Sequence, residues 1–200
     1  MLSAASQNDI TSRRLHKDPV ESPVVRHDEM RGFALIDLLF VCGIIGVLSV
    51  IALPRVLLAK QSAGAASAIG SLRVINSSEF TFALTCGGGF YAPSLTLLGT
   101  APPASREAFI TPGLATADTI TRAGYSIRLT STAFTGSPGS CNGAAPGSTG
   151  QAFKAGADPT EPGNTRHFAS NANGQIFEDT SSLFAVMPEV GDPPSGHLLR

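Results

Sequence analysis

The stretch FALIDLLFVCGIIGVLSVIAL, which runs from Phe33 to Leu53, decides the fold class of this chain. Its only clearly polar residues are Asp37 and Ser49. A helix needs about 20 consecutive apolar residues to cross the hydrocarbon core of a bilayer, and a buried helix of a soluble protein is seldom apolar on every side over that length. The stretch therefore predicts one membrane-spanning helix over residues 33–53, surrounded by membrane lipid.

Residues 1–32 differ sharply in composition from this stretch. They mix basic and acidic side chains without a sustained apolar period, so they predict a solvated leader peptide. The whole chain has 14 Lys and Arg against 15 Asp and Glu, which gives a formal net charge of −1. A protein that binds nucleic acid through phosphates needs a basic cluster, and none is present. We therefore expect no nucleic acid among the partners.

The boundary between the leader and the apolar stretch carries a motif. Residues 31–39, RGFALIDLL, resemble the prepilin signature of type IV pilins and type II secretion pseudopilins. In that signature a basic residue precedes a Gly at the scissile bond, an aromatic residue begins the mature chain, and an acid follows a Leu-Ile pair. Gly46 and Pro54 stand where many pilins carry a helix-weakening Gly and Pro. The chain departs from the family at Asp37, where the family usually has Glu.

The resemblance implies an α+β, pilin-like fold. A long N-terminal helix would cover residues 33–85, with its membrane-spanning half at 33–53. A globular β-rich head, a small antiparallel sheet laid over the helix, would cover residues 86–200. The leader, residues 1–32, would be removed.

The resemblance also implies a structural subunit of a type IV pilus or pilus-like filament. Prepilin peptidase would cut after Gly32, and Phe33 would be N-methylated. The subunit would start as a single-pass protein of the bacterial inner membrane and join other pilin subunits in an extracellular or periplasmic filament, through a pilus assembly platform. Asp37 would pair with the new N-terminal amine of a neighbour, and the segment from Gly46 to Pro54 would lose helical hydrogen bonds in the filament.

Three alternatives remain open at this point. The same motif fits a type II secretion pseudopilin. A plain single-pass anchor carrying a binding or enzymatic domain explains the apolar run, although it explains neither the Gly-Phe boundary nor Asp37. An ordinary secretory signal cut near Val50-Ile51-Ala52 would release a soluble protein, but the long polar leader and the acid within the apolar core disfavour it.

Beyond Pro54 the pattern becomes that of an amphipathic helix. At 100° per residue one apolar stripe collects residues that we expect to face the head: Ala65, Ala68, Leu72, Ile75 and Phe82. Glu79 falls inside this stripe, so it either marks the edge of the stripe or has a partner that the sequence does not identify. Gly87-Gly88-Gly89 predicts the C-terminal cap of the helix.

The head shows short strand patterns. Residues 125–130 alternate apolar and polar side chains, and residues 165–170 and 175–179 predict two more strands. The turn Asn171–Gly174 joins these two, because Asn-Gly favours a tight hairpin. Phe153 begins a further candidate strand.

The remaining parts of the head are rich in turn-forming residues. Residues 136–164 are dense in Gly, Pro, Ser and Asn, which predicts a long surface loop. Residues 101–119 predict a connecting loop that contains a short helical turn.

The three cysteines separate by location. Cys42 lies within the apolar run, where we expect a buried thiol. Cys86 and Cys141 lie in the part that would be exported, where an oxidising compartment permits a disulfide that closes a long loop of the head. Two free thiols are the alternative.

Motifs for catalysis are missing from the sequence. It contains no G-x-S-x-G, H-E-x-x-H or C-x-x-C motif, so we expect no enzyme, no cofactor and no metal site. Asp158, Glu161 and Asn164 offer oxygen ligands that suit Ca²⁺, but without EF-hand spacing a plain polar loop is favoured. His167 alternates with strand residues and is expected to project outward into solvent.

Overall fold

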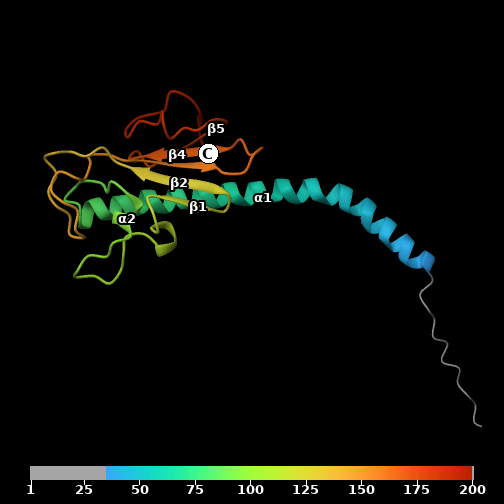
Figure 1. The fold of residues 1–200 in the computed structure, drawn as a ribbon. Helices are drawn as coiled ribbons and strands as arrows, with labels where there is room; N and C mark the ends of the chain where they lie inside the picture. Colours follow the sequence, from blue (N-terminus) through green and yellow to red (C-terminus); the bar gives the residue numbers. More distant parts are fainter. Residues whose placement is uncertain (1–34, 200) are drawn as a thin grey trace, which may run out of the picture. The chain divides into compact units, whose positions relative to one another are not determined.

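A computed structural model describes residues 35–199 of the chain (Figure 1). Helix α1 runs from Leu35 to Thr85 with Pro54 in its interior, so the predicted long helix is confirmed over the described residues. The leader, Gly32 and Phe33 lie outside them. By internal contacts the chain divides into two compact units, residues 1–45 and residues 46–200.

Helix α1 ends in the glycine cap that the sequence predicts. The N–H groups of Cys86 and Gly87 both donate to the carbonyl of Phe82, at 2.8 Å. Gly88 and Gly89 follow with φ values of 62° and 92°, in the left-handed region that side chains with a Cβ seldom adopt. The cap turns the chain out of the helix and into the head.

The head contains one antiparallel sheet in which each strand pairs with the next along the chain, in the order β1-β2-β3-β4-β5-β6. This sheet and the long helix confirm the α+β fold class. The strands are β1 (Thr119–Arg122), β2 (Tyr125–Thr130), β3 (Lys154–Pro159), β4 (His167–Asn171), β5 (Ile176–Asp179) and β6 (His197–Leu198).

Three strands lie close to where the sequence places them. β2 has the predicted bounds, and β4 and β5 begin one or two residues later than the patterns at 165–170 and 175–179. The hairpin turn between β4 and β5 contains Gly174 at φ 76°, as the Asn-Gly pair predicts.

The prediction of a surface loop over residues 136–164 is wrong in its last part. β3 occupies residues 154–159 and pairs with β2 on one side and β4 on the other, so it lies inside the sheet. Ala155 and Ala157 on β3 are fully buried. Small side chains fit there because the bulky residues of α1 and of the neighbouring strands already fill the core.

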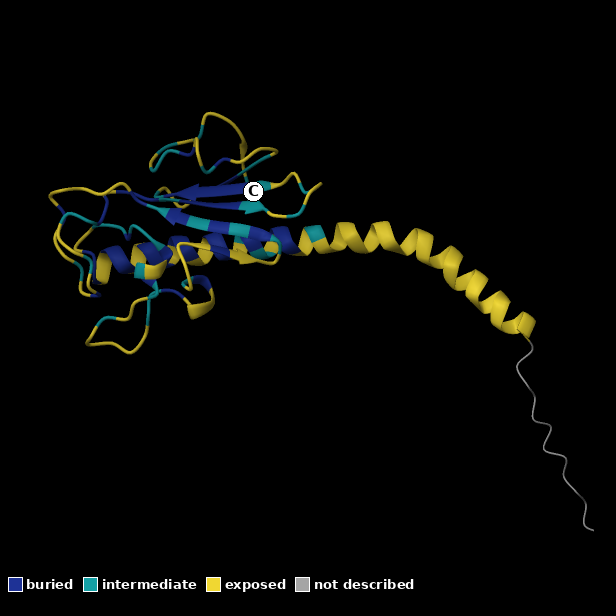
Figure 2. Ribbon diagram, in the orientation of Figure 1, coloured by how far each residue is buried: buried dark blue, intermediate teal, exposed yellow. Residues whose placement is uncertain are grey.

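One face of the sheet packs on the second half of α1 (Figure 2). The predicted stripe on α1 is buried there, together with Glu79. Burial of the large apolar side chains in this layer is the main source of stability for the head. The largest of them are Leu72, Ile75, Phe82, Tyr125, Ile127, Phe153 and Phe168.

The opposite face of the sheet is covered by the C-terminal segment between β5 and β6, residues 180–196. Leu183 and Met187 of this segment form a second apolar cluster with Ala169 and Phe177 of the sheet. The head therefore has three layers: helix, sheet and C-terminal segment.

Two short helices connect α1 to the sheet. α2 (Leu95–Leu98) is capped by Ser94, whose hydroxyl oxygen accepts a hydrogen bond from the N–H of Leu97. The 3₁₀ helix η1 (Pro112–Leu114) is the short helical turn expected within residues 101–119.

Candidate functional site

The first half of α1 is the most unusual surface of the molecule. Its apolar window has a mean hydropathy of 2.7, and none of that window is buried within the chain. Every residue from Leu35 to Lys60 is exposed, including large side chains such as Leu39 and Ile51. By length and composition this helix is able to cross a membrane.

Asp37 lies in the first turn of α1 and is exposed. No hydrogen bond or ion pair joins its side chain to another residue within the described range 35–199. Carboxylates in apolar helices are expensive and usually have a partner. The single chain does not supply that partner among its described residues.

Gly46 and Pro54 both lie inside the continuous helix. A Cβ built on Gly46 meets nothing within 4 Å, so packing within this chain does not require glycine there. Pro54 lacks the N–H that would bond one turn back, so the helix is locally short of one hydrogen bond. Both residues weaken α1 in its exposed half, where no contact with the head compensates.

The predicted disulfide is present. Cys86 and Cys141 are joined, with their Cα atoms 4.9 Å apart and 55 positions apart in the chain. The N–H of Cys141 also donates to the carbonyl of Cys86 at 3.2 Å. The bridge ties the C-terminal end of α1 to the loop that precedes β3.

Cys42 contradicts the expected buried thiol. It is free and exposed on the surface of α1. Its apolar neighbours in sequence are exposed as well. An apolar run alone does not bury its members unless a second surface covers them.

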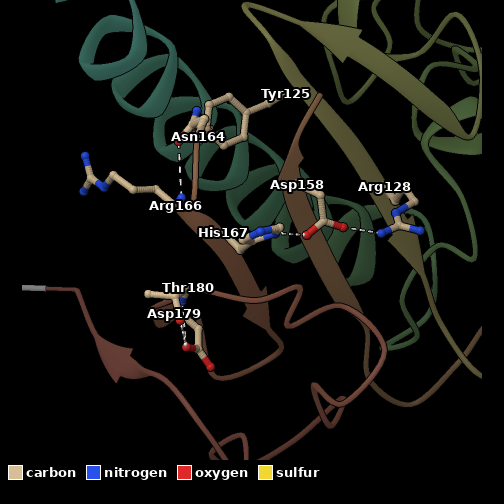
Figure 3. A network of polar contacts seen from close by, with 8 residues as sticks. All are labelled: Tyr125, Arg128, Asp158, Asn164, Arg166, His167, Asp179 and Thr180. Atoms are coloured by element: carbon tan, nitrogen blue, oxygen red, sulfur yellow. Dashed lines mark hydrogen bonds and ion pairs between the residues drawn. The ribbon is translucent and has the colours of Figure 1, made fainter. Parts of the chain in front are cut away.

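His167 also differs from expectation. Figure 3 shows Asp158 of β3 between His167 of β4 and Arg128 of β2. The ring Nδ1 of His167 lies 2.8 Å from Oδ1 of Asp158, and the His167 side chain is only 18% exposed. Adjacent strands bring these three side chains together on the outer face of the sheet, which the alternation along one strand does not reveal.

The three candidate Ca²⁺ ligands separate into different contacts. Asp158 joins the cluster just described, Glu161 pairs with Lys60 at 2.7 Å, and the amide of Asn164 donates to the Tyr125 hydroxyl at 3.1 Å. The carboxylates are therefore engaged with cations of the chain itself. Among the described residues no group of three or more His, Cys, Asp or Glu side chains is placed to hold a metal ion.

A further ion pair joins Arg166 to Glu178 of β5. Arg166 donates from Nε and Nη2 to the two carboxylate oxygens of Glu178, at 2.5 and 3.0 Å. This fork holds the pKa of Glu178 below its usual range, chiefly through the hydrogen bonds from Arg166. Nearby, hydrogen bonds from the Ser195 hydroxyl and from the N–H of Thr180 lower the pKa of Asp179. Figure 3 shows the contact between Asp179 and Thr180.

Hollows on the head are open and carry few convergent polar groups. One of about 500 Å³ lies beside Cys141 and is lined mainly by Pro102, Pro103 and Phe109. Another of about 320 Å³ lies against the outer face of α1, with Arg122 at its border. Neither contains a nucleophile next to a base, which is the arrangement that acyl or glycosyl transfer requires.

The described residues thus offer an exposed apolar helix surface and a disulfide-bridged head as candidate functional features. The helix surface can enter lipid or pack against other apolar helices, and the head is cross-linked to the end of that helix. Comparison of the chain with protein-family models, with curated proteins and with solved structures finds no match.

Proposed function

We propose that this protein is a structural subunit of a type IV pilus or pilus-like filament, polymerised through its N-terminal helix. The observation that carries the proposal is the division of α1. Its first half is apolar and wholly exposed, whereas its second half is built into the head. A catalytic or ligand-binding domain on a simple anchor has no need of a helix shared in this way.

An exposed apolar helix has two favourable environments, which are lipid and a bundle of similar helices. Moving between them changes little apolar exposure to water, so assembly from the membrane is driven by packing and polar contacts. The subunit would therefore wait in the bacterial inner membrane as a single-pass protein. It would then join the filament in the extracellular or periplasmic space.

Processing is the second part of the proposal. Prepilin peptidase would cut after Gly32, and Phe33 would become the methylated N-terminus. Asp37 has no partner among the described residues. It would then form an ion pair with the N-terminal ammonium group of a neighbouring subunit. Because that amine exists only after cleavage, processing would precede assembly.

The glycine and proline of α1 fit the same function. A Cβ on Gly46 meets nothing within 4 Å among the described residues, and Pro54 removes one helical hydrogen bond. The helical segment between these two residues would lose its backbone hydrogen bonds when subunits stack along the filament axis. The partners would be other pilin subunits and the assembly platform.

The decisive experiment compares processing and assembly in one strain that carries the assembly machinery. We expect mass spectrometry to place the mature N-terminus at Phe33, and Gly32→Leu to leave the precursor uncut and absent from sheared filaments. Gly70→Leu is the matched control, because Gly70 lies on the exposed side of α1, where a Cβ meets nothing within 4 Å. This control should be cut normally.

Other outcomes would point to the alternatives. A start near Leu53 would identify a secreted protein and contradict the proposal. An uncut chain that stays in the membrane would identify a plain anchor. A subunit that is cut correctly but assembles only into a short periplasmic structure would assign it to the type II secretion pseudopilins.

A further inference from the structure

Glu79 is a buried acid that the filament proposal does not use. It lies on α1 and is 0% exposed. Its Oε2 accepts one hydrogen bond, from the N–H of Ala92 at 2.9 Å. Its Oε1 is buried and has no hydrogen-bond partner among the described residues. One N–H group is poor compensation for the hydration that a carboxylate loses on burial.

An aromatic cluster adjoins the segment that donates to Glu79, and no described ion pair includes Glu79. The ring of Tyr91, next to Ala92, packs against Phe80 and Phe153, with centroids 6.1 and 5.1 Å away. Tyr91 is the titratable group that faces Glu79, and burial together with the Glu79 charge raises its pKa. The ion pairs within residues 35–199 all join other side chains. Burial therefore raises the pKa of Glu79 to about 8, opposed by the hydrogen bond from Ala92.

The segment Phe90–Ala92 is held between α1 and the loop that precedes β3. On one side Ala92 donates to Glu79, and on the other Tyr91 exchanges two hydrogen bonds with Gly150, at 2.8 and 3.1 Å. The segment follows directly after the glycine cap that ends α1. A change at Glu79 therefore acts where the helix is joined to the head.

We propose that Glu79 is a proton-dependent latch, which holds the segment Phe90–Ala92 against α1 when its carboxyl is protonated and releases it when the carboxyl ionises. An ionised carboxylate needs water, and it gains water only when this segment moves away. The protonated acid instead keeps the apolar contact and still accepts the N–H of Ala92. The latch goes beyond the filament proposal and stands independently of it.

The direction of the pH effect follows from linkage. The pKa of Glu79 is about 8 in the closed head and near its ordinary 4.5 once the segment opens. The closed state is therefore fully favoured below about pH 4.5. The equilibrium constant for closure falls about tenfold per pH unit from about pH 4.5 to about pH 8 and stays constant above that value.

The test uses the full-length protein in detergent micelles. Hydrogen exchange of the peptide that contains Ala92, corrected for the intrinsic rate, measures the opening equilibrium of the segment. From pH 5.5 to 7.5 the wild-type opening constant should rise about 70-fold. Glu79→Gln, which mimics the protonated acid, should remove this rise, while the exposed control Glu107→Gln should keep it. An equal rise in wild type and Glu79→Gln would overturn the latch.

A second measurement needs only the wild-type chain. With ¹³C-labelled glutamate carboxyls, one resonance should titrate above pH 7, because the ionised form of Glu79 is disfavoured by burial. If every glutamate carboxyl titrates below pH 6, the proposal is wrong, whether or not the glutamine variant folds.

Discussion

The hydroxyl of Ser170 on β4 donates a hydrogen bond to Oδ1 of Asn76 on α1, at 2.9 Å. Ser170 is 0% exposed and Asn76 only 6%, so the bond lies inside the layer between helix and sheet. The amide of Asn76 also reaches the carbonyl of Gly174 in the β4–β5 turn, at 3.4 Å. If the helix slid along the sheet, these polar atoms would be buried without partners, so the pair fixes the register of α1.

Removal of this pair should destabilise the head. We expect Asn76→Ala to lower the free energy of unfolding by about 1–3 kcal/mol, because the Ser170 hydroxyl is left buried without its acceptor. Urea unfolding of the detergent-solubilised protein measures the change. Ser77→Ala, on the exposed side of the same turn, is the control and should cost no more than about 0.5 kcal/mol. Equal losses for the two variants would show that the pair does not fix the register.

Gly156 on β3 is required by a close contact with the C-terminal segment. A Cβ at this position would lie 2.9 Å from Cβ and 2.8 Å from Cδ2 of Phe184. The guanidinium group of Arg128 also lies over the Phe184 ring, with its central carbon 4.4 Å from the ring centroid. Gly156→Ala should therefore lower the free energy of unfolding by about 1–3 kcal/mol.

A double-mutant cycle tests the cause of that loss. In a Phe184→Ala background, Gly156→Ala should cost much less, because the clashing ring is gone. Gly113→Ala serves as the control, since a Cβ on Gly113 meets nothing within 4 Å. Strictly additive effects of the two substitutions would contradict the proposed contact.

The disulfide should contribute strongly to the stability of the head. Loss of the bridge in Cys86→Ser/Cys141→Ser should lower the free energy of unfolding by about 4 kcal/mol, because cross-linking a loop of this length restricts the unfolded chain. The measurement is urea unfolding, together with the mass of the non-reduced peptides. Cys42→Ser removes the free thiol and should leave the unfolding of the head unchanged.

The ion pair between Arg166 and Glu178 predicts an acid-dependent stability. The pKa of Glu178 is lowered in the folded head, so its contribution is present above the unfolded value near 4.5 and is lost as pH falls through the folded value. Glu178→Gln should be less stable than wild type at pH 7, and the difference should vanish in acid. Urea unfolding at several pH values measures it. The exposed pair of Lys60 and Glu161 supplies the control, because Glu161→Gln should change stability by about 0–1 kcal/mol. A difference that persists unchanged in acid would contradict this account.

Asp37 tests the assembly mechanism directly. Asp37→Ala should leave membrane insertion intact or improved, because a costly carboxylate is removed, and cleavage after Gly32 should continue. Filament yield should fall, because a neighbour's ammonium would lack its counter-charge in an apolar bundle. Asp37→Glu should assemble at least as well as wild type. The measurement is the sheared-filament yield relative to total membrane subunit, and equal yields for all three would assign Asp37 no role in assembly.

Much of the fold follows from local patterns in the sequence. The apolar run and the stripe after Pro54 predict one helix ending near residue 85, and the glycine triplet predicts its cap. The alternation over residues 125–130 predicts β2 with the correct bounds. These features are predictable because each is determined by residues that are only a few positions apart in the chain. The Cys86–Cys141 pair was predictable for a simpler reason, since the third cysteine lies in the apolar run.

Other features were decided only by the tertiary structure. The candidate strand at Phe153 corresponds to β3, which begins at Lys154, but its length and its place inside the sheet were not predictable. β3 carries Ala, Gly and Pro, whose strand preference is weak, and β2 and β4 supply its hydrogen bonds on both sides. The pairing of β3 with β4 places His167 beside Asp158. Glu79 is buried because the segment after the helix folds back over it. The contacts that assign these roles join residues distant in the chain. Local periodicity specifies which face a side chain occupies, whereas strand register and packing specify what that side chain meets.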